Sequence, residues 1–302
     1  MIDPPKWSDE QLKAERNQAE QRFIVERQGE GPSAFYSTWD SVEPVVRDTI
    51  RMTGDLAAIT GSILLRERGL WQKLRYFTAP PISEEDLWTL VGKKFKQVPE
   101  SHAESAASAL NSVLDNKRFG WVQQNRPPTD EEFNAAVMAT TVLLTHETLK
   151  TNRRGASSQF QEKEVADALE KAGLTFDGSR SAILALDELP RGHFSRERKV
   201  AGAKCDIPIR LHDGRLLALE CKVSNGPKNS WKRLQREVGG KSDTWKGTHG
   251  QQVITGAVLA GVFDMSCLIA AQNKQKVAIF WQHDLAPLIS FVAETKKPTN
   301  SK

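Results

Sequence analysis

Two carboxylates and a lysine stand in neighbouring segments that have the pattern of strands, at a spacing that could bring them together. The first segment, residues 204–211, contains Asp206, and the second, residues 216–223, contains Glu220 and Lys222; a turn at residues 212–214 separates them. Carboxylate oxygens are the ligands that Mg²⁺ prefers, and Mg²⁺ also binds substrate phosphate oxygens. A lysine beside the metal could orient or deprotonate the attacking water, or stabilise negative charge. These residue types therefore indicate metal-dependent hydrolysis of a phosphate ester.

The length of the turn decides whether the three side chains share one face of a hairpin. A two-residue turn would place Asp206 opposite Cys221 and would mix charged with apolar residues on each face. A three-residue loop at 212–214 puts its glycine where a left-handed backbone is needed, and it pairs Asp206 with Glu220. Asp206, Glu220 and Lys222 then lie on one face. The other face is apolar throughout and consists of Ile207, Ile209, Leu217, Leu219 and Cys221. We predict this second register.

An acid two residues before a lysine is weak evidence on its own. The same spacing occurs at Asp115-Asn116-Lys117, Glu197-Arg198-Lys199 and Glu294-Thr295-Lys296. Those three segments lack a strand context and a paired aspartate, whereas Glu220 follows the apolar run 216–219. The backbone carbonyl of Cys221 lies between the two ligand positions and could complete a metal site with Asp206. The alternative interpretation is a surface strand pair with a glutamate–lysine contact.

Two further features adjoin this hairpin. Glu162 precedes Val165 and Leu169 by three and seven residues, so it shares the core-facing side of a helix expected over 160–172. It could reach the metal site, or it could simply favour the start of that helix. The segment after Lys222 is basic and suits phosphate contacts, although a solvated helix face is the alternative. The residues that we predict to contact DNA there are Asn225, Lys228, Ser230, Lys232 and Arg233.

The elements that must position these residues divide the chain into two parts. Residues 1–152 form a helical lobe, with capping patterns that begin at Ser8, Ser83, Ser101 and Thr129. The small and polar segment 153–158 marks the seam. Residues 153–302 form an α/β core, in which the helix and the hairpin precede further elements. These are a helix from about Asn229, a strand at 253–263, a helix at 265–273, a strand at 277–281 and a helix at 285–293.

The composition is that of a globular protein that stays in the cytoplasm. Of 302 residues, 26% are charged and 39% hydrophobic, and no apolar run approaches the roughly 18 to 20 residues that cross a bilayer. The N-terminus lacks the apolar core of a signal peptide. Three cysteines are too few for a disulfide framework and have no zinc-type spacing. The net charge of +4 permits a phosphate-rich partner without demanding one.

Asp206, Glu220-Cys221-Lys222 and the helix that carries Glu162 resemble the PD-(D/E)XK nuclease superfamily, whose core is a helix, a strand hairpin, a helix and a further strand. The resemblance extends over roughly residues 155–292. The segments 220–225, 229–234, 257–263 and 280–285 are similar to those of XamI-like type II restriction endonucleases. Cys205 stands where the superfamily has a proline, but that proline is not a ligand, so no chemistry is lost.

The resemblance implies a restriction-endonuclease-like α/β core with a mixed central sheet. It implies Mg²⁺-dependent hydrolysis of double-stranded DNA by a homodimer at a short specific sequence, leaving 5′-phosphate ends. A partner methyltransferase that protects the host is a possible partner, which the sequence itself does not show. Asp206 and Glu220 would be metal ligands, Lys222 the catalytic lysine and Glu162 an accessory acid. The helical lobe would supply base contacts or the dimer interface. Rival interpretations are a repair or junction-resolving nuclease, an RNA-directed nuclease, and a DNA-binding protein that does not cleave.

Overall fold

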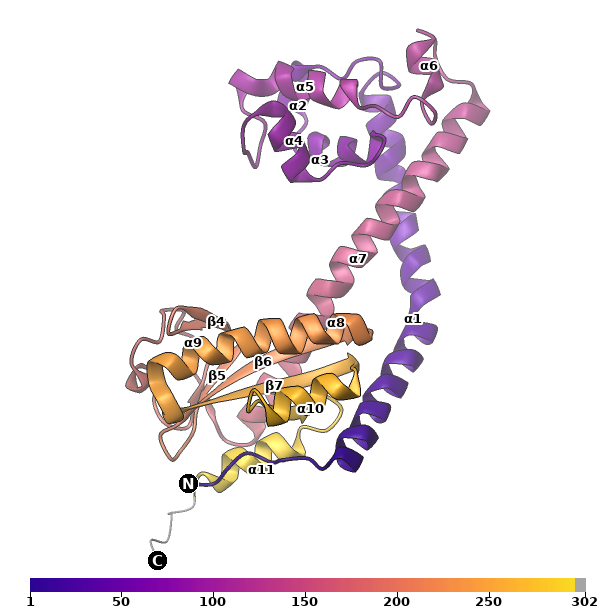
Figure 1. The fold of residues 1–302 in the computed structure, drawn as a ribbon. Coiled ribbons are helices and arrows are strands. Elements are labelled where there is room, and N and C mark those ends of the chain that lie inside the picture. The colour runs from indigo at the N-terminus through magenta and orange to yellow at the C-terminus, as the bar shows by residue number, and fades with distance from the viewer. Residues whose placement is uncertain (297–302) are drawn as a thin grey trace, which may run out of the picture. The chain divides into compact units, whose positions relative to one another are not determined.

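The computed structural model describes residues 1–296, apart from the side chains of residue 30 and of residues 153–157. The chain forms two compact units (Figure 1). One unit is Glu30–Asn152, and the other combines Met1–Gly29 with Arg153–Lys302. The chain passes between them inside helix α1 (Asp9–Met52) and helix α7 (Asp130–Lys171). The predicted division differs in that residues 1–29 belong with the C-terminal part.

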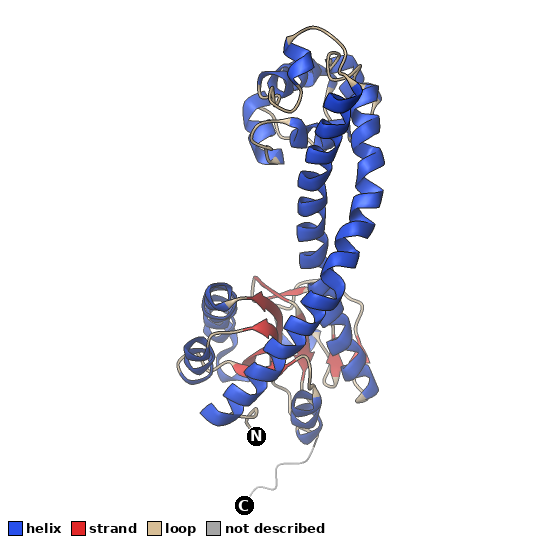
Figure 2. Cartoon of the chain, turned by 90° about the vertical axis from the view of Figure 1, so that its right-hand side faces the viewer, coloured by secondary structure: helices blue, strands red, loops and turns tan. Residues whose placement is uncertain are grey.

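The unit formed by residues 30–152 is helical (Figure 2). Besides parts of α1 and α7 it contains α2 (Gly61–Arg66), α3 (Leu70–Leu74), α4 (Glu84–Val91), α5 (Ala103–Ser112), α6 (Gly120–Gln123) and the 3-10 turns η1 (Arg75–Phe77) and η2 (Glu100–His102). Its core contains the wholly buried aromatic residues Trp71, Phe77, Phe119 and Trp121. Aromatic rings bury much apolar area, so these four contribute strongly to the core of this unit.

Three of the four predicted helix caps are present. The backbone N–H of Gln11 donates to Ser8, that of Asp86 to Ser83 and that of Glu132 to Thr129. In each case the capping residue's own N–H donates back to the side chain three residues on, which completes a capping box. The cap predicted at Ser101 is wrong, because α5 begins only at Ala103 and its N-cap residue is His102.

A mixed six-stranded sheet forms the centre of the other unit, as predicted (Figure 2). Its strand order is β1 (Thr175–Phe176), β2 (His193–Phe194), β5 (Ile207–Arg210), β6 (Leu216–Asn225), β7 (Val253–Val262) and β8 (Ala278–Trp281). Strands β6, β7 and β8 are parallel to one another, whereas β5 is antiparallel to both its neighbours. A separate antiparallel pair is formed by β3 (Arg198–Val200) and β4 (Ala203–Cys205), and η3 (Leu186–Glu188) precedes β2.

Helices cover both faces of this sheet. The C-terminal part of α7 and helix α11 (Ala286–Glu294) pack on one face, against residues such as Leu219 and Val258. The start of α1, the π-helical segment η4 (Lys232–Val238) and helix α10 (Met265–Asn273) pack on the other, against Ala257 and Leu259. Consecutive residues of β7 therefore serve opposite faces, as the period of a strand requires. After β6 and a bend at Gly226, the chain forms helix α8 (Pro227–Trp231), η4, α9 (Gly239–His249) and the turn η5 (Gly250–Gln252), which follow one another without interruption.

Residues 1–29 are bound to the sheet unit by specific contacts. The indole Nε1 of Trp7 donates to the carbonyl of Ile279 in β8 at 2.8 Å. Arg215, the residue before β6, donates to the carbonyl of Ile2. The backbone of residues 153–158, for which the sequence predicted a flexible seam, is helical and belongs to α7; the side chains of 153–157 lie outside the described residues. No helix in residues 1–296 has the length and apolarity needed to span a membrane.

Candidate active site

The hairpin of β5 and β6 has the three-residue loop and the register predicted from the sequence. Ile207 pairs with Leu219 and Ile209 with Leu217. Gly214 takes the left-handed backbone with φ of +94°, which a residue with a Cβ rarely adopts. All five residues of the predicted apolar face are buried together under α7 and α11. The opposite face is therefore free to carry charged side chains.

Asp206 lies at a break between two strands that the sequence had suggested to be one. Cys205 ends β4 and pairs with Arg198, whereas Ile207 begins β5 and pairs with Leu219 in the central sheet. The backbone bends at Asp206 between them. Its carboxylate Oδ2 accepts a hydrogen bond from the backbone N–H of Cys221 at 2.9 Å, where an unbroken β5 would otherwise have continued the ladder. The bend thus places this carboxylate beside β6.

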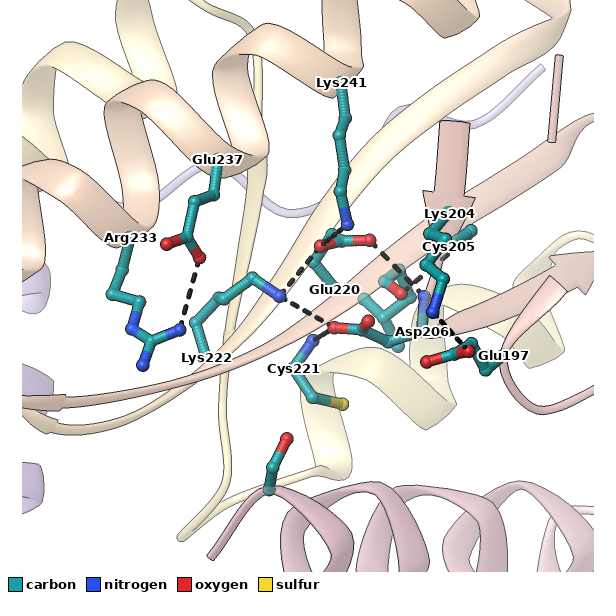
Figure 3. Close-up of polar contacts among 12 residues, drawn as sticks. Glu197, Lys204, Cys205, Asp206, Glu220, Cys221, Lys222, Arg233, Glu237 and Lys241 are labelled. Atoms are coloured by element: carbon teal, nitrogen blue, oxygen red, sulfur yellow. Dashed lines mark hydrogen bonds and ion pairs between the residues drawn. The ribbon is translucent and has the colours of Figure 1, made fainter. Parts of the chain in front are cut away.

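Two carboxylates and two lysines form one ion-pair cluster (Figure 3). The Nζ atom of Lys222 lies 2.8 Å from Asp206 Oδ2 and 2.8 Å from Glu220 Oε2. Lys241, from α9, donates to the same Glu220 oxygen at 2.6 Å. The other Glu220 oxygen, Oε1, accepts from the backbone N–H of Asp206 at 3.3 Å. Every polar atom of the Glu220 carboxylate is therefore engaged.

Burial and mutual charge control the protonation of this cluster. The Glu220 side chain is fully buried, and burial together with the Asp206 charge raises the pKa of its carboxyl group above the ordinary value. Burial lowers the pKa of Lys222, but Asp206 and Glu220 outweigh it and hold that pKa above its usual range. Burial likewise raises the pKa of the Cys221 thiol, helped by Asp206. The Cys221 side chain belongs to the apolar face of the hairpin, on the opposite side of β6 from the charged cluster.

The donor set fits a hard divalent cation. Asp206 and Glu220 each present an oxygen to a single nitrogen, so both can contact one cation at that position. The backbone carbonyl of Cys221 is available as a third donor, because the N–H and C=O of one strand residue face the same neighbour and its N–H faces Asp206. Within residues 1–296, no group of three or more His, Cys, Asp or Glu side chains gathers for a metal. The ligand set therefore depends on two carboxylates and a carbonyl.

Lys241 is a member of the cluster that sequence reasoning missed. It lies in the basic segment that follows the hairpin, and its contact with Glu220 joins residues 21 positions apart. The segment η4 just before it is π-helical, a rare conformation that is frequent at functional sites. The sequence showed only a lysine within the basic helical stretch that begins near Asn229. Nothing in its spacing distinguished it from its neighbours.

Glu162 contacts residues outside the charged cluster. Its Oε1 accepts from the hydroxyl of Ser158 at 3.3 Å, and its Oε2 lies 3.4 Å from Arg196. The Glu162 side chain is 20% exposed, and its charge helps to raise the pKa of the Cys221 thiol. It therefore lies near β6, on the face covered by α7. None of its described hydrogen bonds or ion pairs joins it to Asp206 or Glu220. Its predicted role as an accessory acid stays a prediction.

The five residues predicted to contact DNA have different surroundings. Lys228 and Lys232 are exposed one helical turn apart, on either side of Trp231, whose side chain is also exposed. Arg233 is half-buried and pairs with Glu237 at 3.3 Å, and the exposed Asn225 accepts from Arg27. Ser230 corrects the prediction, because it is fully buried. Its hydroxyl donates to the carbonyl of Pro227 and accepts from the N–H of Asp264, so it fixes the start of α8.

A mixed sheet flanked by helices, with two carboxylates and a lysine at the junction of β5 and β6, defines a restriction-endonuclease-like fold. Residues 54–281 match the family described as XamI restriction endonuclease, an interval that contains the whole cluster. The chain belongs to this family, so the predicted class of enzyme, a site-specific deoxyribonuclease, is confirmed.

A curated relative supports the same assignment. The chain is 32% identical over 256 residues to the type II restriction enzyme XamI of Xanthomonas campestris pv. amaranthicola. The aligned part covers 80% of this chain and 91% of that enzyme. No solved structure matches the chain. The similarity therefore extends well beyond the hairpin and into the helical unit.

Proposed function

We propose that this protein is a Mg²⁺-dependent type II restriction endonuclease, which hydrolyses phosphodiester bonds of double-stranded DNA at a short specific sequence. One observation carries the proposal: an oxygen of Asp206 and an oxygen of Glu220 lie at the same distance, 2.8 Å, from a single nitrogen of Lys222. Both carboxylates can therefore contact one cation. The membership of the family and the similarity to a type II enzyme support the choice of DNA as substrate.

The residues of the cluster would have separate roles. Asp206, Glu220 and the Cys221 carbonyl would hold the metal. When bound, Mg²⁺ activates water for attack and neutralises negative charge on the phosphate. In the metal-free cluster, Asp206 and Glu220 hold the pKa of Lys222 above its usual range. We assign Lys222 to orienting the attacking water and stabilising charge on the phosphate.

The remaining expectations concern partners. A two-fold protein matches a palindromic site, so we propose a homodimer in which the helical unit supplies base contacts or the dimer interface. A methyltransferase that modifies the same sequence is the partner we propose, because it would protect the host DNA. Both proteins would work in the cytoplasm, where that DNA lies.

Removal of the metal tests the proposed activity directly. The purified full chain is incubated with several large unmethylated DNAs, with Mg²⁺ or with EDTA. We expect discrete fragments with Mg²⁺ and intact DNA with EDTA, and sequencing of the fragment ends should give one site. Cutting of branched DNA but not of linear duplex would instead indicate a junction-resolving nuclease. Tight binding without any cutting would leave a DNA-binding protein, and cutting of RNA alone would contradict the choice of polymer.

The exposed pair Lys228 and Lys232 is proposed to contact DNA phosphates beside the cluster. Each replacement, Lys228→Ala or Lys232→Ala, should weaken duplex binding at low salt. Each should also make the slope of log affinity against log salt less steep by about 0.9, because the variant makes one phosphate contact fewer and therefore releases one counterion fewer from the DNA. Fluorescence anisotropy at several salt concentrations measures both quantities.

A matched control for this surface is Lys274→Ala. Lys274 is exposed and lies between α10 and β8, so it stands near the opposite ends of the parallel strands. Its replacement removes the same charge but should leave the slope unchanged. An unchanged slope in Lys228→Ala and Lys232→Ala would remove both residues from the proposed DNA surface.

A further inference from the structure

One oxygen of Glu220 is contacted by two ammonium groups. Lys222 Nζ lies 2.8 Å from Oε2 and Lys241 Nζ lies 2.6 Å from the same atom. The Glu220 side chain is fully buried, so no solvent competes for that oxygen. The position in which an external cation would contact Glu220 is therefore already occupied by cations of the protein itself.

The formal charges of the cluster sum to zero. Asp206 and Glu220 carry one negative charge each, and Lys222 and Lys241 carry one positive charge each. The adjacent pair formed by Lys204 and Glu197, 2.8 Å apart, is also neutral (Figure 3). A divalent cation that entered this cluster would leave a net charge of +2 in a buried site, which is unfavourable without a compensating anion. A DNA phosphate beside the site is such an anion.

We propose that Lys241 holds the place of the metal at Glu220 in the DNA-free protein and thereby makes metal binding depend on DNA. Lys241 is then a positioning residue, and the inference rests on the proposed metal-dependent function. Its side chain is 26% exposed, whereas that of Lys222 is 9% exposed. Lysine is a long and flexible side chain, so Lys241 can leave Glu220 and turn toward a phosphate. Lys222 is held by two carboxylates, Asp206 and Glu220, whereas Lys241 pairs with Glu220, so Lys241 is the ammonium group that is displaced more readily.

The test measures metal binding without cleavage. Isothermal titration of the DNA-free full chain with Mg²⁺ compares wild type with Lys241→Gln, which leaves the cluster one negative charge in excess. We expect Lys241→Gln to bind Mg²⁺ at least about tenfold more tightly, which corresponds to about 1.4 kcal/mol. In wild type, the affinity for Mg²⁺ should rise by a similar factor when duplex DNA with a non-hydrolysable backbone is present.

Two variants control for charge and for folding. Lys204→Gln removes the same charge from an exposed pair next to the cluster and should bind Mg²⁺ as wild type does. Lys241→Arg keeps the charge and should restore weak binding. Circular dichroism is used to check that all variants are folded, and if Lys241→Gln does not fold, the comparison is made with Lys241→Met. Equal Mg²⁺ affinity in wild type and in the uncharged variant would overturn the inference.

The two proposals can fail separately. If wild type cuts DNA with Mg²⁺ but the loss of the Lys241 charge does not tighten metal binding, only the inference on Lys241 is wrong. If neither protein binds Mg²⁺ with or without DNA, and wild type does not cut, the proposed function is wrong as well.

Discussion

Glu220→Gln is expected to reduce Mg²⁺-dependent cleavage by on the order of 10²- to 10³-fold. The neutral amide keeps the size of the side chain, but it removes the charge that a divalent cation requires of a ligand. One amide oxygen must also replace the carboxylate oxygen that Lys222 and Lys241 share. The rate is measured by single-turnover cleavage of a duplex that contains the recognition sequence.

The control for this variant is Glu294→Gln. Glu294 is exposed at the end of α11 and also precedes a lysine by two residues, so it has the same motif outside the cluster. Its cleavage rate should equal that of wild type. Affinity for DNA should not fall in Glu220→Gln, because a negative charge has been removed. Full cleavage by Glu220→Gln would contradict its role as a ligand and would favour a structural ion pair.

Lys222→Met is expected to lower both cleavage and stability. Its ammonium group joins Asp206 and Glu220, and its removal leaves two carboxylates close together without the cation between them. Removal of one partner from a buried ion pair typically costs about 3–5 kcal/mol of unfolding free energy. Cleavage should fall on the order of 10²- to 10³-fold, because charge on the phosphate is no longer stabilised. Urea denaturation and single-turnover kinetics measure the two effects.

A double variant separates stability from chemistry. In Lys222→Met combined with Asp206→Asn, the repulsion between Asp206 and Glu220 is removed, so part of the lost unfolding free energy should return. Cleavage should not return, because a proposed metal ligand is now missing as well. Unchanged stability in the single variant would show that Lys222 is not an essential counter-charge of the buried carboxylates.

The sequence was sufficient for those parts of the site that local rules determine. The glycine at 214 and the alternation of apolar residues allowed only one register, and that register brings Glu220 and Lys222 to one face with Asp206. The ends of the strand predicted at 253–263 and of the helix predicted at 265–273 agree with the structure to within one residue. Both are continuous apolar segments with polar residues at their ends. The burial of a whole strand face leaves little freedom in register.

Features that depend on tertiary contacts could not be predicted in this way. The break at Asp206 arises because Cys205 pairs with Arg198 in a different sheet. No local sequence pattern predicts that pairing. Ser230 looks like any polar residue of a basic helix, yet its burial is set by the loop that carries Asp264. Lys241 contacts Glu220 across a helix–sheet interface. Each of these depends on how separate elements pack, which the sequence pattern does not encode directly.

The arrangement of the two units has a consequence for how this protein could diversify. Residues 30–152 interrupt the sheet unit as one uninterrupted stretch, and none of the residues of the charged cluster lies within it. Recombination at only two points could therefore exchange that stretch between relatives and leave the charged cluster, the proposed active site, intact. Both points lie inside helices, so a new stretch must preserve helical phase at each splice. If the stretch reads bases, a new target sequence could be acquired in a single genetic event.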